Sequence, residues 1–144
     1  MNNIYLIGMP GCGKTSLGKK IAQKLNLSFV DLDYYLVEKE RHTISDIFKT
    51  KGENYFRQAE TKYLKEVSGL DNQVVSTGGG IIICDENTEV MKNSGIVIFI
   101  DTPPDCILKN SSLSGRPLLK NKDDIFKLYE DRYSKYKNAA HFIV

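Results

Sequence analysis

The fold is decided by the stretch Gly8-Met9-Pro10-Gly11-Cys12-Gly13-Lys14-Thr15. The apolar run 4–7 precedes it, and apolar residues at helical spacing follow it between positions 17 and 25. A strand, a glycine-rich loop with the pattern G-x-x-x-x-G-K-S/T and a helix, in this order, are typical of a loop that binds phosphate. Backbone N–H groups and the positive end of the helix dipole attract the anion. Lys14 is expected to reach the β- and γ-phosphates of a nucleotide, and the Thr15 hydroxyl to bind Mg²⁺. The alternative is an ordinary strand–helix turn, which needs glycine but has no need of a lysine.

The composition is that of a soluble globular protein with one domain. The chain has 144 residues, of which 41% are hydrophobic and 26% charged, and its net charge is +2. These values give no reason to expect a nucleic-acid or membrane partner. The longest apolar run, 95–100, is too short to span a membrane, and the N-terminus lacks a signal pattern, so we expect a cytoplasmic protein. Cys12, Cys84 and Cys106 have no metal-binding spacing and are expected to be free thiols.

Strands and helices alternate along the chain. Strands are expected at residues 3–7, 28–30, 73–76, 95–100 and 141–144, and helices at 14–25, 34–41, 43–48, 52–67, 85–93 and 123–140, with another helix opening at Pro103. This alternation predicts an α/β fold with three layers, in which helices cover both faces of a parallel sheet. Ligands of such sheets bind at the carboxyl ends of the strands. The phosphate loop, the Asp31–Asp33 segment and the run Gly78-Gly79-Gly80 all follow strands, so we expect them at one edge.

Two aspartates follow the second expected strand. Asp31 and Asp33 stand two residues apart at a strand end, and we expect their side chains to point in different directions. One aspartate near the phosphates would hold Mg²⁺ through water, and the other would accept the proton of the acceptor hydroxyl. The simpler interpretation is that Asp33 caps the next helix. The nearby phosphate loop favours the functional interpretation.

Arg57 and Glu60 lie three residues apart on an expected helix, a spacing that usually indicates a surface ion pair. The same spacing suits a guanidinium that grips an anionic substrate and is oriented by the glutamate. Spacing alone does not separate these interpretations. The run Gly78-Gly79-Gly80 is easier to assign, because a turn needs one glycine and each further glycine is entropically costly. Three in succession indicate a ligand that lies directly against the backbone.

Two more arginines lie in the last third of the chain. Arg116 belongs to the segment 111–122, which is rich in Ser, Gly, Pro and Lys. Beside a phosphate loop we expect this segment to be a lid that brings the arginine to the phosphates, the alternative being a solvated loop. Arg132 lies in a helix dense with charges, where by itself it indicates only a solvated face. His42 and His141 match no pattern and are assigned no role.

The motifs together resemble those of the shikimate kinases, within the nucleoside-monophosphate-kinase-like group of phosphate-loop kinases. The resemblance covers essentially the whole chain and depends on the order and spacing of the motifs. They are Gly8 to Thr15, Asp31-Leu32-Asp33, Gly52-Glu53-x-x-Phe56-Arg57-x-x-Glu60, Ser76-Thr77-Gly78-Gly79-Gly80, Arg116-Pro117-Leu118-Leu119 and Arg132-Tyr133-x-x-Tyr136.

The resemblance implies a phosphate-loop kinase fold whose parallel strands have the order 2-3-1-4-5. It implies a single kinase domain, residues 1–144, with a substrate-binding subdomain at about 31–60 and a lid at 111–122. The implied activity is transfer of the γ-phosphate of ATP to the 3-hydroxyl of shikimate, with Mg²⁺, in chorismate and aromatic amino acid biosynthesis. The implied protein is a cytoplasmic monomer with no nucleic-acid or membrane partner.

The resemblance also implies roles in phosphate transfer. Asp33 would hold the shikimate hydroxyls and accept the proton, while Lys14 and Arg116 would stabilise charge on the transferred phosphoryl group. Thr15 would bind Mg²⁺, with Asp31 assisting through water. The residues that would bind ATP are Gly11, Cys12, Gly13, Lys14, Thr15, Ser16, Lys109 and Arg116.

For the acceptor, the resemblance implies that Arg57 and Arg132 bind the substrate carboxylate. Asp33 completes the implied substrate site, together with the backbone of Gly78, Gly79 and Gly80.

The sequence departs from the family in two places. It ends at Val144, directly after the last expected strand, whereas relatives continue into a helix that helps to wall the adenine pocket and covers one sheet face. Lys109 stands where many relatives place an arginine over the adenine, and lysine has no planar face for stacking.

Two other functions are compatible with the phosphate loop. One is a kinase for another small metabolite or nucleotide, such as gluconate or AMP, although the Asp-Gly-Phe-Pro-Arg signature expected of adenylate kinases is missing from the sequence. The other is a non-catalytic, kinase-like binding protein. The presence of every charged residue that the chemistry needs speaks against the latter.

Overall fold

A computed structural model describes residues 2–104 and 122–144. Within these residues, five parallel strands form one sheet in the predicted order, β2-β3-β1-β4-β5. The strands are β1 (Asn3–Ile7), β2 (Ser28–Asp31), β3 (Gln73–Ser76), β4 (Gly95–Phe99) and β5 (Phe142–Ile143). The helices are α1 (Lys14–Leu25), α2 (Leu32–Glu40), α3 (Ile44–Ser68), the 3-10 helix η1 (Ile81–Ile83), α4 (Asp85–Ser94) and α6 (Lys122–Ala139). Cys106, Lys109, Arg116 and nearly all of the predicted lid lie outside the described residues.

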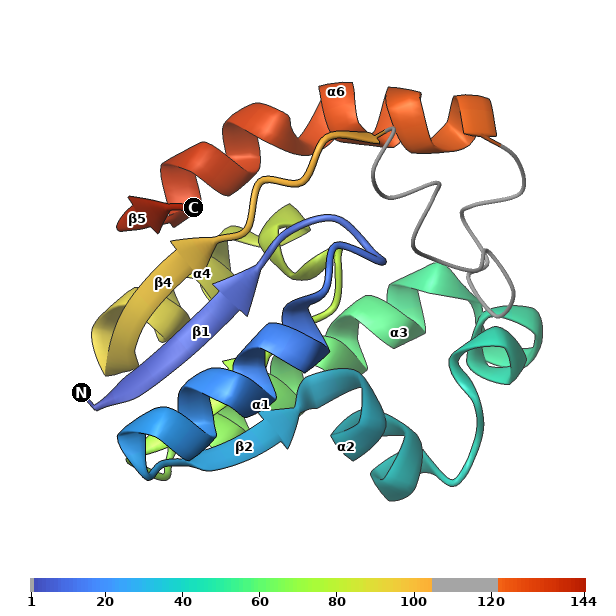
Figure 1. Cartoon of the computed structure of the whole chain (residues 1–144). Helices are drawn as coiled ribbons and strands as arrows, with labels where there is room; N and C mark the ends of the chain where they lie inside the picture. The colour runs from blue at the N-terminus through green and yellow to red at the C-terminus, as the bar shows by residue number, and fades with distance from the viewer. Residues whose placement is uncertain (1, 105–121) are drawn as a thin grey trace.

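Alternating side chains of β1 separate two apolar cores. Tyr5 and Ile7 belong to the larger core, which α2, α3, α4 and α6 also line. Leu6 belongs to a smaller core on the other face of the sheet, together with Ala22 of α1. Figure 1 shows α1 in front of the sheet and α3 and α4 behind it. A central strand buried on both faces explains the uninterrupted apolar run that precedes the phosphate loop. The predicted three-layer α/β arrangement is confirmed.

Strand register brings the predicted site segments to one edge of the sheet. Ser76, the last residue of β3, is paired with Leu6 of β1 and with Asp31 of β2. These three strands therefore end at nearly the same level, and the segments that leave them start side by side. The phosphate loop, the start of α2 and the three glycines meet there, as the rule for parallel sheets predicts.

The end of β2 differs from the prediction in one respect. The strand ends at Asp31 and α2 begins at Leu32, so no strand continues to Asp33. Asp31, and not Asp33, caps the helix, because its Oδ1 accepts a hydrogen bond from the Tyr34 N–H at 3.2 Å. Asp33 lies in the first helical turn, and a helix aims successive side chains in directions that a strand does not. The two aspartates are thereby free to face different parts of the site.

Three further features differ from the expectations: the connection of two helices, the burial of β4 and the length of the last strand. The helices expected at 43–48 and 52–67 are joined in α3 through a kink at Gly52, although Thr43 caps the first of them as predicted, accepting from the Asp46 N–H at 3.1 Å. β4 was expected to be buried throughout, but Ile96 is 45% exposed. The Ile96 side chain points to the sheet face that α1 covers, but α1 packs mainly against β1, β2 and β3. The last strand is only two residues long.

Candidate active site

Left-handed glycines shape the phosphate loop. Gly11 and Gly13 have φ values of 78° and 92°, a region that side chains rarely tolerate. Gly13 forms the N-cap of α1, and its carbonyl accepts the first helical hydrogen bond, from the Leu17 N–H at 3.0 Å. The loop backbone therefore curls around the positive end of α1 and presents N–H groups to an anion. Ser16 follows as an exposed residue in the first turn of the helix.

Lys14 is the buried cation of this loop, with 7% of its surface exposed. Its Nζ donates to the carbonyl oxygens of Gly8 and Met9 at 2.9 and 2.8 Å. The loop backbone thus holds the Lys14 ammonium group against the phosphate loop itself. Cys12 also lies close, with Sγ 3.6 Å from the amine. Among the described residues, Cys12 and Cys84 are free thiols, as predicted.

The structure places Asp31 beside the phosphate loop. The Thr15 hydroxyl donates to Asp31 Oδ2 at 3.3 Å, while the other carboxylate oxygen caps α2. Two hard oxygen donors at the start of α1 fit Mg²⁺, which prefers oxygen and takes few protein carboxylates because it keeps several waters and binds phosphate. Within residues 2–104 and 122–144, no cluster of three or more His, Cys, Asp or Glu residues is arranged to hold a metal.

Asp33 faces the glycine run. A Cβ placed on Gly78 would lie 2.7 Å from Asp33 Oδ1 and 3.1 Å from Glu60 Oε2, so both carboxylates lie against this glycine. The neighbouring Gly79 is packed against the phosphate loop, because its Cβ would lie 2.6 Å from Cδ of Pro10. Asp33 therefore lies near the junction of the phosphate loop and the glycine run.

The Arg57–Glu60 pair joins a half-buried arginine to a fully buried glutamate and is not an ordinary surface pair. Arg57 Nη1 is 3.1 Å from Glu60 Oε1, and only 1% of the Glu60 side chain is exposed. Burial raises the pKa of Glu60 to about 7, Arg57 opposes this rise, and the nearby Asp33 adds to it. The exposed Glu53 also contacts Arg57, at 3.4 Å. Burial of Glu60 excludes an ordinary surface ion pair, whereas the binding of an anionic substrate by Arg57 stays a prediction.

Each glycine of the run is required by a neighbouring side chain. Gly78 borders the two carboxylates and Gly79 borders Pro10, while a Cβ on Gly80 would lie 2.6 Å from the Arg57 guanidinium carbon. The φ angles of all three are accessible to other residues, so close approach and not backbone conformation excludes a side chain. The sequence-based explanation, a ligand against the backbone, stays a prediction. The structure supplies a second reason, because the charged groups of the site themselves occupy that space.

Arg132 is buried, contrary to the indication from its charged helix. Its exposed fraction is 7%. It lowers the pKa of Tyr136, one turn later on α6, and also the pKa of Glu60. Arg57 acts on the pKa of Tyr136 as well. The two arginines, which are far apart in sequence, therefore share one region with Glu60.

Comparison with known proteins decides the family. The family model described as "Shikimate kinase" matches residues 10–144. A shikimate kinase of Clostridium botulinum (strain Eklund 17B / Type B) is 50% identical over 99% of this chain and 87% of that protein. The chain belongs to the shikimate kinase family. A shikimate kinase of Persephonella marina is 43% identical over 96% of the chain and 86% of that protein.

Solved structures of the shikimate kinase family agree with this assignment. A structure described as shikimate kinase from Acinetobacter baumannii in complex with shikimate matches with a TM-score of 0.96 and 35% identity, over 100% of this chain and 83% of that one. Shikimate kinase from Aquifex aeolicus matches with a TM-score of 0.86 and 39% identity, over 99% and 85%. A gluconokinase from Sinorhizobium meliloti has a TM-score of 0.51 at 15% identity, a likeness of fold alone. The predictions of a phosphate-loop kinase fold and of an ATP-dependent phosphotransferase are confirmed.

A sequence signal for Arg132 existed in the periodicity of α6. Ile125, Tyr136 and Ala139 are buried at helical spacing, and Arg132 falls on the same stripe. An arginine on the apolar stripe of a helix requires a buried partner, because burying an unpaired charge is costly. The charges on the other faces of α6 concealed this stripe, and only the resemblance to shikimate kinases indicated a role.

Proposed function

We propose that this shikimate kinase family member transfers the γ-phosphate of ATP to the 3-hydroxyl of shikimate, giving 3-phosphoshikimate and ADP. The observation that carries the proposal is the buried Arg57–Glu60 pair beside Asp33, at the sheet edge that also carries the phosphate loop. A buried carboxylate and a half-buried guanidinium next to the phosphate loop fit an acceptor that has both hydroxyls and a negative charge. A buried ion pair adds little to the stability of a folded chain, so its presence here favours a role in ligand binding.

Phosphate transfer in this proposal uses residues of the loop and of α2. Asp33 accepts the proton as the acceptor oxygen bonds to the γ-phosphorus, and the bond to the bridging oxygen of ADP breaks. Lys14 moves from the Gly8 and Met9 carbonyls to the phosphates and neutralises charge that shifts toward ADP. Arg116 would add a second positive charge, and the nucleotide would contact the loop through Gly11 to Ser16 and through Lys109.

Mg²⁺ belongs to the same proposal. Thr15 would bind it directly and Asp31 through water, in line with their hydrogen bond. When bound, Mg²⁺ would neutralise phosphate charge during transfer. The protein's own contribution is to keep the two oxygen donors at the start of α1, where the Asp31 side chain is fixed by its cap on α2.

The acceptor carboxylate would be bound by Arg57 and Arg132. Glu60 keeps the Arg57 fork in place at 3.1 Å, and Tyr136 lies one turn from Arg132 on α6. The backbone of Gly78, Gly79 and Gly80 would lie alongside. Residues 31–60 and 111–122 are proposed as the substrate-binding subdomain and the lid. We further propose that the enzyme is a cytoplasmic monomer without nucleic-acid or membrane partners. No helix in the described part of the chain has the length and apolar character needed to cross a bilayer.

The test is a coupled assay of ADP release with shikimate, gluconate and AMP in parallel. Rapid turnover of shikimate is expected, and turnover of gluconate or AMP without shikimate would overturn the proposal. Asp33→Asn should lower kcat by roughly 100-fold or more if Asp33 is the proton acceptor. Asp46→Asn, at an exposed position in the first turn of α3, is the matched control and should leave kcat unchanged.

A further inference from the structure

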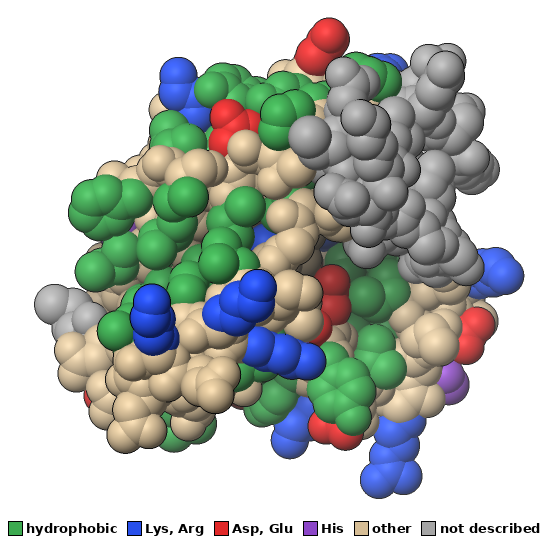
Figure 2. All heavy atoms as spheres, in the orientation of Figure 1, with side chains coloured by type: hydrophobic (Ala, Val, Ile, Leu, Met, Phe, Trp, Pro, Cys, Tyr) green, Lys and Arg blue, Asp and Glu red, His purple; other side chains and the backbone are tan. Residues whose placement is uncertain are grey.

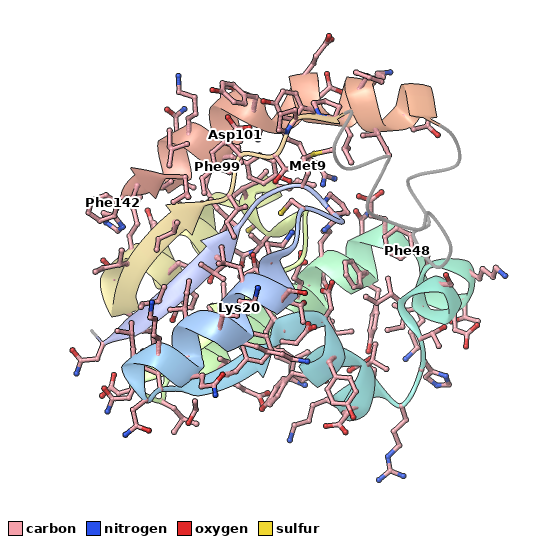
Figure 3. All side chains as sticks on the ribbon, viewed as in Figure 1. Met9, Lys20, Phe48, Phe99, Asp101 and Phe142 are labelled. Carbon is pink, nitrogen blue, oxygen red and sulfur yellow. The ribbon has the colours of Figure 1, made fainter. Side chains whose placement is uncertain are left out.

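Tyr136 connects α6 to the glycine run. It is completely buried, and its hydroxyl donates to the Gly79 carbonyl oxygen at 2.5 Å. Its ring stacks on Phe99 of β4, with centroids 4.9 Å apart and ring planes 24° apart. Figure 3 shows Phe99 between the sheet and α6. Stacking on Phe99 fixes the position of the Tyr136 ring, so its hydroxyl is directed at the Gly79 carbonyl.

Arg132 also acts on the same hydroxyl. Arg132 lies one turn earlier on α6, a spacing at which side chains meet, and its positive charge lowers the pKa of the Tyr136 phenol. Burial raises the pKa of Tyr136 to about 12, with Arg132 opposing the rise. At neutral pH the phenol is therefore protonated and can donate to Gly79, while its oxygen stays able to accept from a donor such as the Arg132 guanidinium.

The peptide group between Gly79 and Gly80 is held from two sides. On one side Pro10 of the phosphate loop packs against Gly79, where a Cβ would approach Pro10 Cδ to 2.6 Å. On the other side the carbonyl oxygen is bound by Tyr136. In a trans peptide the N–H points opposite to the C=O, so the Gly80 N–H is turned away from Tyr136. Gly80 in turn borders the Arg57 guanidinium.

We propose that Tyr136 is a positioning residue for the acceptor carboxylate: its hydroxyl fixes both the Arg132 guanidinium and the Gly79–Gly80 peptide. The inference rests on the proposed function, which places the carboxylate at Arg57 and Arg132. Tyr136 touches neither the carboxylate nor the phosphate in this assignment. It acts through the two groups that it holds.

A purely structural role for the hydroxyl makes a different prediction. A buried phenol that merely satisfies a carbonyl would affect stability when removed, and it would affect all substrates equally. Loss of a positioning residue instead raises the KM of the acceptor and leaves the KM of MgATP unchanged. The experiment therefore separates the two substrates.

Tyr136→Phe removes the hydroxyl and keeps the stacked ring. The expected result is a rise of roughly tenfold in the shikimate KM, the size of one lost hydrogen bond to a charged group, with kcat and the MgATP KM within about twofold of the parent. Tyr129→Phe is the matched control, because it removes another hydroxyl of α6, one that donates to Asp101 Oδ1 at 2.8 Å. The control should leave the shikimate KM unchanged.

A second measurement protects the result from partial unfolding. Shikimate and its uncharged methyl ester are compared as acceptors in parent and variant. Loss of folded protein lowers both rates equally, whereas misplacement of the carboxylate site reduces the preference for shikimate over the ester. An unchanged preference, or an equal rise in both substrates' KM values, would overturn the inference.

The failure of this inference is distinguishable from failure of the proposed function. Calorimetric titration of shikimate into the parent protein, with no nucleotide present, reports acceptor binding directly. A parent that turns over shikimate while Tyr136→Phe binds it as tightly refutes the positioning role alone. A parent that neither binds nor phosphorylates shikimate refutes both.

Discussion

Glu60 carries a carboxylate that the fold keeps almost entirely out of water. Its carboxylate is 1% exposed, and its pKa is raised from 4.5 to about 7, first by burial, with Arg57 opposing and Asp33 adding to the rise. Between these two pH values the folded protein holds a proton that the unfolded chain has released. The free energy of unfolding contributed by Glu60 is therefore fully present below pH 4.5 and is lost as the pH rises through 7.

The variant Glu60→Gln should remove this pH dependence. In urea unfolding the parent is expected to lose stability relative to the variant between about pH 4.5 and 7, by up to about 3 kcal/mol in the linkage relation. Glu53→Gln is the control, since Glu53 contacts the same arginine from an exposed position and should keep the parental pH dependence. Equal pH profiles for the parent and Glu60→Gln would contradict the assignment.

Gly80→Ala tests whether the glycine run makes room for site side chains. The added Cβ would meet the end of the flexible Arg57 side chain, which can move, so we expect less than about 1 kcal/mol loss of stability. The displaced guanidinium should raise the shikimate KM. Gly69→Ala, where the nearest atom is 3.4 Å away and φ is −72°, should change neither quantity. An unchanged KM for Gly80→Ala would show that Arg57 keeps its position.

Individual residues differ in how far sequence could assign them. Lys14 and Thr15 follow from the loop pattern, because the chemistry of phosphate binding is local. The division of work between Asp31 and Asp33 depends on one helical boundary, at Leu32, which the pattern placed too late. For Arg132 the sequence carries only the buried stripe of α6, because Glu60, whose pKa it lowers, lies on another helix. Non-local contacts of this kind leave little trace in a short window of sequence.

At the scale of elements, the kink in α3 is the feature that a pattern of apolar residues misses. Gly52 has φ 88° and ψ 169°, a conformation that is almost restricted to glycine. It bends the helix before the segment that carries Arg57 and Glu60. The two helices predicted on either side of Gly52 are present, and they are joined directly at this one residue.

Gly52→Ala should therefore destabilise the protein without a steric clash. Within residues 2–104 and 122–144 no atom lies within 4 Å of the added Cβ, so the expected cost is backbone strain, about 1–3 kcal/mol. Urea unfolding measures the loss. Lys49→Ala, at an exposed position in the preceding helical turn, should cost little. Equal stabilities for the two variants would show that the helix straightens without penalty.

Across the whole molecule, the order of the strands was implied by family resemblance and not by periodicity. Local patterns locate strands, but the order 2-3-1-4-5 depends on which strands pair, a non-local property. An uninterrupted apolar run also predicts a strand that is buried on both faces, which does not hold for β4. In β4, Val97 and Phe99 are fully buried, while Ile96 is 45% exposed, because only one face of that strand is covered along its length.

The uncovered face continues from β4 to β5 and forms an exposed apolar stripe. Phe142, paired with Ile98, is 60% exposed, and Val144 is 71% exposed. Figure 2 shows hydrophobic side chains gathered on this side of the molecule, and Figure 3 places Phe142 at its outer end. Contiguous apolar surface binds apolar dyes, whereas scattered single side chains do not.

The parent protein should accordingly increase the fluorescence of an apolar dye such as anilinonaphthalene sulfonate under native conditions. The double variant Ile96→Thr with Phe142→Thr should bind less dye, because threonine keeps the strand propensity but interrupts the stripe. Its shikimate KM should be parental, since neither residue lies in the proposed site. Leu70→Thr is the control, an isolated side chain that is 65% exposed, and it should leave the dye signal unchanged. If the double variant and the control lowered the signal equally, the dye would be reporting general exposure, and β4 and β5 would not form one continuous apolar surface.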